Sequence, residues 1–244
     1  MVRRAGLPRP GSAAGEKGPG DYVTESDHAS EAAILEVLAR DSPGLAVLAE
    51  EAGGTRAATM WAVDPLDGTT NFTRRFPAVA ISVGLLDARK PVCGVVIAPF
   101  LDLEFAAAAG RGATLNGEPL LPLGRGDTSR AIVSTGFPFR NKHRLARYRA
   151  VLDGALAQFE DLRRVGAAAL DLSWTASGTF DGYFELGLGL WDLTAGAALV
   201  LEVGGVVTDW AGGDGWVESG DILAAPPAVH EALLALALKA PPSP

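Results

Sequence analysis

The segment Met60–Phe72, MWAVDPLDGTTNF, decides how this chain folds and what it can bind. Its apolar start predicts a buried strand, which we expect to end at Asp64 because Pro65 removes a backbone donor and forces a turn. Two carboxylates, Asp64 and Asp67, can converge on that turn, and the Leu66 carbonyl lies between them. Oxygen ligands of this kind suit Mg²⁺, so the segment is a candidate metal site.

The residues after Asp67 favour an anion beside the metal. Gly68 lets the backbone approach a ligand closely, and Thr69 and Thr70 are expected to open a short helix whose N–H groups attract negative charge. An ordinary turn with a capping aspartate would account for the same residues. The segment alone therefore leaves both interpretations open.

Acidic residues elsewhere in the chain support the metal interpretation. The pair Glu50–Glu51 follows a short predicted strand, and its two charges would repel each other without a cation. Asp27 and Asp192 stand at expected helix starts, where each taken singly is explained as an N-cap. Together with the Asp64–Asp67 turn, these positions predict one site that holds more than one metal ion.

Composition argues against several other functions. A net charge of −8 over 244 residues disfavours sequence-independent nucleic-acid binding, so we expect no nucleic-acid partner. The 3 histidines lie far apart, which disfavours zinc and Ser-His-Asp chemistry. The single cysteine, Cys93, allows no disulfide within the chain and fits a reducing compartment. No secretory signal and no bilayer-spanning run is recognisable, so a cytoplasmic protein without a membrane partner is expected.

The chain is expected to form one compact catalytic unit from two halves. Residues 1–20, rich in Gly, Pro, Ala and Arg, show no period and predict a flexible leader. Residues 21–130 predict a helix to about residue 40, then a largely antiparallel sheet with a hairpin at Asn116–Gly117. Residues 131–244 alternate strands and helices, which predicts an α/β layer beside the first sheet. The predicted helices of this half cover Leu145–Phe159, Gly166–Ser177, Asp192–Val203 and Val229–Leu238.

Two blocks of the sequence resemble the signatures of one family. Trp61–Phe72 resembles the first signature of the inositol monophosphatase family, and Trp191–Gly205 resembles its second. Asp21–Asp27 and Leu48–Glu51 resemble the two shorter blocks that precede the first signature. The four blocks stand in the family's order with compatible spacing. The resemblance implies a mixed α+β fold, the layered αβαβα sandwich of the sugar phosphatases, and a likeness that extends from about Lys17 to the C-terminus.

The resemblance also implies a phosphomonoesterase that uses two to three Mg²⁺ ions. The implied metal ligands are Glu50, Asp64, the Leu66 carbonyl, Asp67 and Asp192. Asp64 would bridge two ions, and a third, weaker ion would rest largely on Glu50 and water. Glu50 and Thr69 would position and deprotonate the attacking water, and Asp27 would orient the Thr69 hydroxyl.

The implied substrate is small and phosphorylated. The implied contacts are Asp64, Leu66, Asp67, Gly68, Thr69, Gly166, Ala168, Glu185 and Asp192. The backbone of Gly68 and Thr69 would hold the phosphate, and Glu185 would accept hydrogen bonds from hydroxyl groups. Asp67–Phe72 and Arg75–Pro77 most resemble the inositol-monophosphate branch, so myo-inositol 1-phosphate is the expected substrate. A homodimer is the expected assembly. Fructose 1,6-bisphosphate, histidinol phosphate, NADP and 3′-phosphoadenosine nucleotides are alternatives.

The chain departs from the family pattern in three places, none of which removes an implied ligand. The long helix usual before Asp21–Asp27 is replaced by the Gly/Pro-rich leader, Ala49 stands where glycine is usual, and Thr194 where alanine is common.

Two other functions remain open. A phosphatase of the haloacid dehalogenase type would need an aspartyl nucleophile two residues before Asp67, where Pro65 stands. A metal- or phosphate-binding protein without activity is the second alternative.

Overall fold

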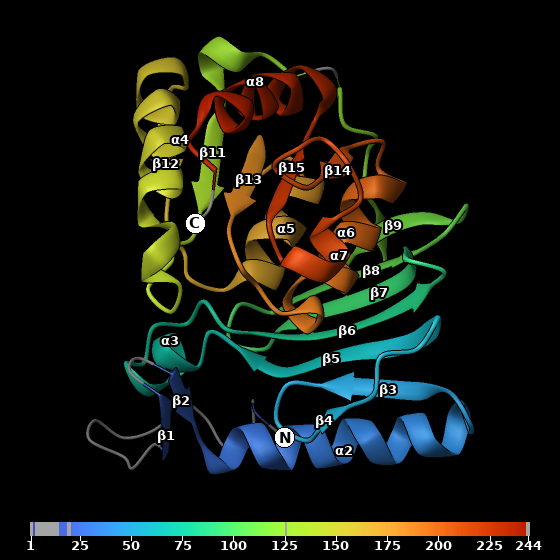
Figure 1. Ribbon diagram of the computed structural model, residues 1–244. Helices are drawn as coiled ribbons and strands as arrows, with labels where there is room; N and C mark the ends of the chain where they lie inside the picture. The colour runs from blue at the N-terminus through green and yellow to red at the C-terminus, as the bar shows by residue number, and fades with distance from the viewer. Residues whose placement is uncertain (1, 3–14, 19–20, 125, 243–244) are drawn as a thin grey trace.

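The helix predicted after Thr24 is α2 (Glu25–Asp41), the first layer of the fold (Figure 1). The Thr24 hydroxyl accepts the Ser26 N–H at 3.2 Å, and Asp27 Oδ2 accepts the Thr24 N–H at 2.9 Å. This capping box makes Thr24 the N-cap and Asp27 the third helical residue, so the expected N-cap role of Asp27 is wrong. The computed structural model describes residues 2, 15–18, 21–124 and 126–242.

The region expected to be a leader contains regular structure. β1 (Gly15–Gly18) pairs antiparallel with β2 (Asp21–Val23). The sequence pattern predicts no regular structure over residues 1–20, and for Gly15–Gly18 that prediction is wrong. The strand depends on pairing with the next segment, and a Gly-rich sequence gives no local sign of such pairing. The other residues of the expected leader, apart from residue 2, lie outside the described part of the chain.

The second layer is an eight-stranded sheet in the order β10-β9-β8-β7-β6-β5-β3-β4. Its strands are β3 (Ala46–Ala49), β4 (Gly53–Gly54), β5 (Thr59–Asp67), β6 (Ala80–Asp87), β7 (Lys90–Ala98), β8 (Leu103–Ala108), β9 (Gly112–Leu115) and β10 (Glu118–Pro119). Every neighbouring pair is antiparallel except β3 and β5, which confirms the largely antiparallel prediction. Asn116 and Gly117 join β9 to β10 with φ values of 51° and 83°, as a tight hairpin turn requires.

β5 is longer than the sequence predicts. It continues past Pro65 to Asp67, and its pairing with β6 shifts register between Asp64 and Asp67. Proline is tolerated there because a bulged residue needs no ladder hydrogen bond. The expected strand end at Asp64 is therefore wrong, although a backbone irregularity does separate the two aspartates. The chain then turns at Gly68 into the short helix α3 (Thr69–Thr73), which the sequence predicts.

The third layer consists of α5 (Ala168–Ala176) and α6 (Leu190–Glu202), which lie between the two sheets (Figure 1). Two paired glycines of β6 and β7 allow α6 to approach the first sheet closely. A Cβ on Gly84 would lie 2.6 Å from the Ala195 nitrogen, and one on Gly94 would lie 2.5 Å from the Ala195 Cα. Only a strand face without side chains can accept a helix backbone at this distance.

The fourth layer is a five-stranded sheet in the order β12-β11-β13-β15-β14. Its strands are β11 (Ile132–Thr135), β12 (Asp161–Arg163), β13 (Gly182–Glu185), β14 (Val206–Thr208) and β15 (Ile222–Ala225). β11 runs parallel to both β12 and β13, whereas the remaining pairs are antiparallel. The sequence pattern predicts no strand at β12, which has only three residues.

The fifth layer is formed by α4 (Leu145–Gln158) and α8 (Pro227–Lys239), which cover the outer face of the second sheet (Figure 1). The short elements η1 (Thr128–Arg130), η2 (Lys142–Arg144) and α7 (Trp216–Ser219) complete the chain. The main apolar core fills the space between the sheets, and a second core lies under α4 and α8. The layered αβαβα prediction is confirmed. Among the described residues, no helix combines the length and apolarity that crossing a bilayer needs.

Candidate active site

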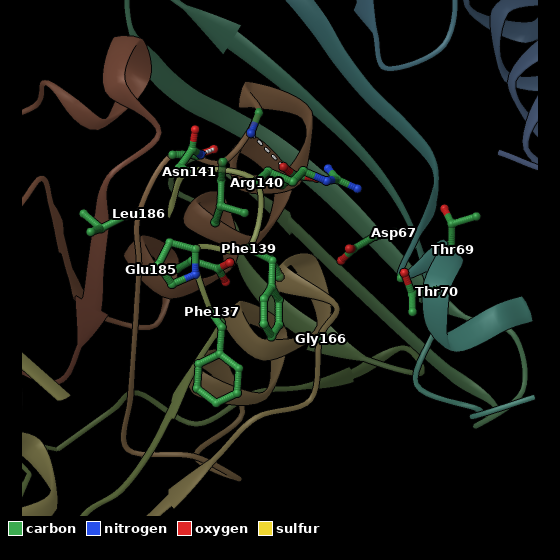
Figure 2. Close-up of a pocket in the computed structure, with 18 of the residues that line it drawn as sticks. Asp67, Thr69, Thr70, Phe137, Phe139, Arg140, Asn141, Gly166, Glu185 and Leu186 are labelled. Atoms are coloured by element: carbon green, nitrogen blue, oxygen red, sulfur yellow. Dashed lines mark hydrogen bonds between the residues drawn. The ribbon is translucent and has the colours of Figure 1, made fainter. Parts of the chain in front are cut away.

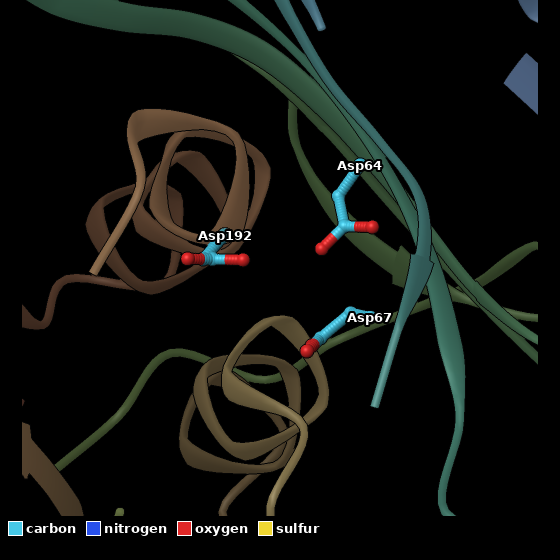
Figure 3. A group of neighbouring side chains, drawn as sticks. All are labelled: Asp64, Asp67 and Asp192. Carbon is cyan, nitrogen blue, oxygen red and sulfur yellow. The ribbon is translucent and has the colours of Figure 1, made fainter. Parts of the chain in front are cut away.

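Three aspartates from two layers of the fold converge (Figure 3). Asp64 and Asp67 come from the bulged end of β5, and Asp192 comes from the first turn of α6. One carboxylate oxygen of each lies within 4.8 Å of the others. Asp64 is 1% exposed and Asp67 8% exposed. A buried, oxygen-only donor set of this kind fits Mg²⁺, because that ion prefers carboxylate ligands and offsets their repulsion.

Burial and mutual repulsion raise the pKa of both buried aspartates. For Asp64 the main cause is loss of hydration, followed by the charges of Glu50, Asp67 and Asp192. For Asp67 the main cause is again loss of hydration, followed by the charge of Asp192. The Ala169 N–H donates to Asp67 Oδ2 at 2.8 Å, and this hydrogen bond lowers the pKa. Metal-free carboxyls in this setting hold protons that a bound cation would displace.

The Asp192 side chain is held by the same kind of capping contact as the Asp27 side chain, a hydrogen bond from the backbone N–H of the N-cap residue. Asp192 is the third residue of α6, and its Oδ2 accepts the Gly189 N–H at 2.7 Å. The helix begins two residues before the start predicted at Asp192, because Gly189 is the N-cap. An N-cap role for Asp192 is therefore wrong. The capping contact fixes the carboxylate so that it points toward Asp64 and Asp67 (Figure 3).

The Thr69 hydroxyl lies between two acceptors. It is 3.1 Å from Asp27 Oδ1 and 3.1 Å from the Leu66 carbonyl oxygen. A hydroxyl has one proton to donate, so it alternates between the two or shares its proton with both, and its lone pairs can accept a proton from water. Asp27 is fully buried and does not line the cavity, so it can act there only through Thr69.

A cavity of about 570 Å³ opens beside the aspartates (Figure 2). Apart from Asp27, every site residue named from the sequence lines it: Glu50, Asp64, Leu66, Asp67, Gly68, Thr69, Gly166, Ala168, Glu185 and Asp192. The structure therefore brings the whole named set together. Gly68 takes a left-handed φ of 86°, which lets the chain turn from β5 into α3 at the floor of the cavity.

The opposite wall was not identified from the sequence. It is formed by residues 136–142, Arg164 and residues 186–189, which follow or end β11, β12 and β13. β12 and β13 each pair in parallel with β11, which lies between them, so the segments after the three strands meet at one edge of the sheet. Ligands usually bind at that edge in α/β folds. Residues 136–142, GFPFRNK, combine two phenylalanines with two basic residues, and this composition could have suggested a ligand-binding segment.

Glu185 presents its carboxyl group to the cavity between the two walls (Figure 2). The Tyr183 hydroxyl donates to its Oε2, and a Cβ on Gly136 would lie 1.9 Å from the same oxygen. Only glycine at 136 leaves room for the carboxyl. Loss of hydration raises the pKa of Glu185 to about 7, although the Tyr183 hydrogen bond and the charges of Arg164 and Arg140 oppose the rise.

Replacing Glu185 by glutamine is expected to stabilise the metal-free protein at pH 8. The folded-state pKa is about 7 against an ordinary 4.5, so the folded state holds a proton that the unfolded state has lost. The free energy of unfolding therefore falls as pH rises from about 4.5 to about 7, and this carboxyl group accounts for a fall of up to roughly 3 kcal/mol. Glutamine has no charge to desolvate, so the variant should be more stable than wild type at pH 8 and equal to it near pH 4. Urea unfolding with a chelator at both pH values measures this, and equal stabilities at pH 8 would contradict it.

The comparisons with known proteins agree with this geometry. The family model described as the inositol monophosphatase family matches residues 3–241. The chain belongs to the inositol monophosphatase family. It is 41% identical over 229 residues to the Nus factor SuhB of Escherichia coli (strain K12), a match that covers 91% of this chain and 84% of that protein.

Solved structures of the same family have the same fold. The extragenic suppressor protein suhB of Bartonella henselae superposes with a TM-score of 0.87 at 34% identity, covering 93% of this chain and 88% of that chain. The inositol monophosphatase of Anabaena (Nostoc) superposes with a TM-score of 0.82 at 38% identity, covering 88% of this chain and 87% of that chain. Family and fold were thus correctly inferred from the signature blocks.

Proposed function

We propose that this chain hydrolyses phosphate monoesters with Mg²⁺, by direct attack of water on phosphorus. The observation that carries the proposal is the convergence of three aspartates and Glu50 on one cavity. Membership of the inositol monophosphatase family supports it. Bound Mg²⁺ would supply Lewis acidity, which makes water easier to deprotonate and offsets the charge that develops on the phosphate.

The chain's own residues would divide the work between metal binding and proton transfer. The resemblance implies that one ion would be held by Glu50, Asp64 and the Leu66 carbonyl. A second ion would be held by Asp64, Asp67 and Asp192, and a third, weaker ion would rest largely on Glu50 and water. Glu50 and Thr69 would position the attacking water and take up its proton, as the resemblance implies. The buried carboxylate of Asp27 keeps the Thr69 hydroxyl in the required orientation.

Removing the Thr69 hydroxyl is expected to slow turnover without loss of metal. Thr69→Val preserves side-chain volume but removes the group that faces Asp27 and the Leu66 carbonyl. We expect kcat to fall by about a hundredfold to ten-thousandfold, the range typical of a positioned proton-transfer group. Thr69→Ser restores a hydroxyl and should recover most of the rate. Calorimetric Mg²⁺ affinity should change little in either variant, and an unimpaired kcat in Thr69→Val would rule out the role.

The proposed substrate is myo-inositol 1-phosphate. The backbone of Gly68 and Thr69 would face the phosphate, Gly166 and Ala168 would line its other side, and Glu185 would accept hydrogen bonds from ring hydroxyls. Structural similarity to the inositol monophosphatase of Anabaena supports this choice. The test compares kcat/KM for myo-inositol 1-phosphate, histidinol phosphate, fructose 1,6-bisphosphate, NADP and 3′-phosphoadenosine nucleotides. A strong preference for histidinol phosphate would defeat the choice.

A metal- or phosphate-binding protein without catalysis is the competing function. The E. coli relative is named a factor rather than an enzyme, which makes the distinction worth measuring. All proposed ligands and Thr69 line one cavity, and Asp27 contacts the Thr69 hydroxyl from behind it. The presence of this complete set favours catalysis. An aspartyl nucleophile is disfavoured because Pro65 stands where that chemistry needs an aspartate. A phosphoryl-enzyme trapped during turnover would overturn the water mechanism.

Assembly, location and partners complete the proposal. We expect a cytoplasmic homodimer in which the two halves of each chain, residues 21–130 and 131–244, act as one catalytic unit. The net charge of −8 supports the absence of a nucleic-acid partner. Light scattering of the purified chain tests the dimer, and filter binding at low salt tests the nucleic-acid expectation.

A further inference from the structure

The loop between β13 and α6, residues 186–189, joins two parts of the proposed site. Glu185, the proposed substrate contact, ends β13 immediately before the loop. Asp192, a proposed metal ligand, lies in the first turn of α6, which follows the loop. All four loop residues line the cavity. The position of the metal ligand relative to the substrate contact therefore depends on the conformation of this loop.

The sequence of the loop does little to fix its backbone. Two of its four residues, Gly187 and Gly189, are glycines, which restrict the backbone least, and Gly187 takes a left-handed φ of 75°. Hydrogen bonds from outside the loop oppose this freedom. The Leu188 N–H donates to the Gly220 carbonyl at 3.0 Å, and Asn141 Nδ2 donates to the Gly187 carbonyl at 3.3 Å. Neighbouring segments, rather than the loop itself, thus determine its conformation.

A largely buried ion pair lies behind the loop. Arg144 Nη1 pairs with Asp221 Oδ1, and Arg144 Nη2 donates to Asp221 Oδ2 at 2.9 Å. Asp221 Oδ1 also accepts the Gly187 N–H at 2.9 Å. The Arg144 and Asp221 side chains are 16% and 12% exposed, and neither residue lines the cavity. The pair can therefore influence the site only through the backbone that it holds. We call Arg144, Asp221 and Gly187 the loop clamp.

The loop backbone packs closely against the segments that carry the loop clamp. A Cβ on Gly187 would lie 2.4 Å from Asn141 Nδ2 and 3.1 Å from Arg144 Nη1. A Cβ on Gly220 would lie 2.0 Å from the Leu188 carbonyl oxygen. The loop is therefore held between the residues before α4 on one side and the residues before β15 on the other.

Each end of the loop connects this restraint to a functional side chain. Before the loop, β13 pairs with β15 through Glu185 and Ile222, the residue after Asp221. After the loop, the Gly189 N–H donates to Asp192 Oδ2 at 2.7 Å. A shift of the backbone at Gly189 would therefore move the Asp192 carboxylate with it.

We propose that Arg144 and Asp221 are positioning residues for the metal site, which hold residues 186–189 so that Asp192 stays within reach of the other metal ligands. This inference rests on the proposed function. Neither residue would touch metal or substrate. Asp221 has the larger effect, because its oxygen accepts the Gly187 N–H, whereas Arg144 fixes the Asp221 carboxylate in turn.

Two substitutions of Asp221 test the proposal. Asp221→Ala removes the acceptor of the Gly187 N–H, whereas Asp221→Asn keeps an oxygen there. For Asp221→Ala we expect the calorimetric Mg²⁺ affinity to fall by about tenfold, the lower end of the range for residues that orient metal ligands. The Mg²⁺ concentration that gives half-maximal phosphate release should rise by the same factor, while kcat at saturating Mg²⁺ stays close to that of the wild type. Asp221→Asn should recover most of the affinity.

Glu218→Ala is the matched control, because Glu218 also belongs to an ion pair, with Arg89, but lies on α7 and does not line the active-site cavity. Amide hydrogen exchange of the metal-free protein gives a measurement that needs neither metal nor substrate. The amides of residues 187–189 should exchange at least about tenfold faster in Asp221→Ala than in Glu218→Ala, because the Gly187 N–H has lost its acceptor.

The variants keep the proposal falsifiable even if one of them does not fold. If Asp221→Ala does not fold, Arg144→Met combined with Asp221→Ala replaces it, since the double variant leaves no unpaired buried charge. An Mg²⁺ affinity that Asp221→Ala leaves unchanged, or that Asp221→Asn fails to restore, would overturn the proposal. Equal exchange of residues 187–189 in Asp221→Ala and Glu218→Ala would also overturn it. If the wild type hydrolyses no phosphate ester, the proposed function fails, and the Mg²⁺ affinities and exchange rates still decide the role of the loop clamp.

Discussion

Replacing Asp67 by asparagine is expected to lower phosphatase turnover by at least roughly a thousandfold, equivalent to about 4 kcal/mol of lost transition-state stabilisation. Asparagine has the same shape and keeps an oxygen that can accept the Ala169 N–H, now 2.8 Å from Asp67 Oδ2. It lacks the negative charge that a second Mg²⁺ would need beside Asp64 and Asp192. The fold should therefore survive while the metal site fails.

The stability and the Mg²⁺ affinity of Asp67→Asn must be measured alongside its turnover. Because burial and the charge of Asp192 raise the pKa of Asp67, the neutral variant should be at least as stable as wild type in a metal-free buffer near pH 8. Calorimetry should show weakened Mg²⁺ binding. Asp153→Asn, on the exposed face of α4, is the matched control and should leave rate and affinity unchanged. Wild-type turnover in Asp67→Asn would defeat the metal assignment.

Replacing Gly94 by alanine is expected to destabilise the fold strongly. The added Cβ would lie 2.5 Å from the Ala195 Cα and 2.7 Å from its carbonyl oxygen. Backbone atoms of a packed helix cannot move aside as a flexible side chain could, so α6 must shift. We expect a loss of about 3 kcal/mol, or roughly 6–12 °C in Tm for a chain of this size.

The matched control for Gly94 is Gly124, where an added Cβ meets nothing within 4 Å. Gly124→Ala should unfold at the wild-type urea concentration. Because α6 carries Asp192, Gly94→Ala should also weaken Mg²⁺ binding in the protein that remains folded. If Gly94→Ala is as stable as Gly124→Ala, the backbone of α6 does not pack closely against β7 at Gly94, and the prediction is wrong.

Much of the fold could be predicted because its signals are local. Thr24 and Asp27 mark the start of α2, and Asn116–Gly117 marks a hairpin, since each depends on residues close in sequence. The end of β5 was misjudged because a proline tolerated at a bulge looks the same in sequence as one that ends a strand. The pairing of β1 with β2 likewise left no pattern in the sequence.

The candidate site was predictable on its acidic side and not on its basic side. Asp64 and Asp67 share one motif, and Glu50 and Asp192 follow or begin predicted elements; the family resemblance supplied the individual role of each ligand. The wall opposite the aspartates comes largely from the segments that follow β11 and β12. These segments are neighbours because β11 pairs in parallel with the three-residue strand Asp161–Arg163. So short a strand has no detectable period, so sequence alone could not place Arg164 beside residues 136–142.

Phosphate release from myo-inositol 1-phosphate, measured against Mg²⁺ concentration, tests the central claim most directly. The account predicts no release in a chelator, a rise in rate as Mg²⁺ fills the site, and no such rise in Asp67→Asn under the same conditions. Asp153→Asn should follow the wild-type curve. No phosphate release by the folded wild-type chain at any Mg²⁺ concentration, or release that persists in excess chelator, would contradict the account.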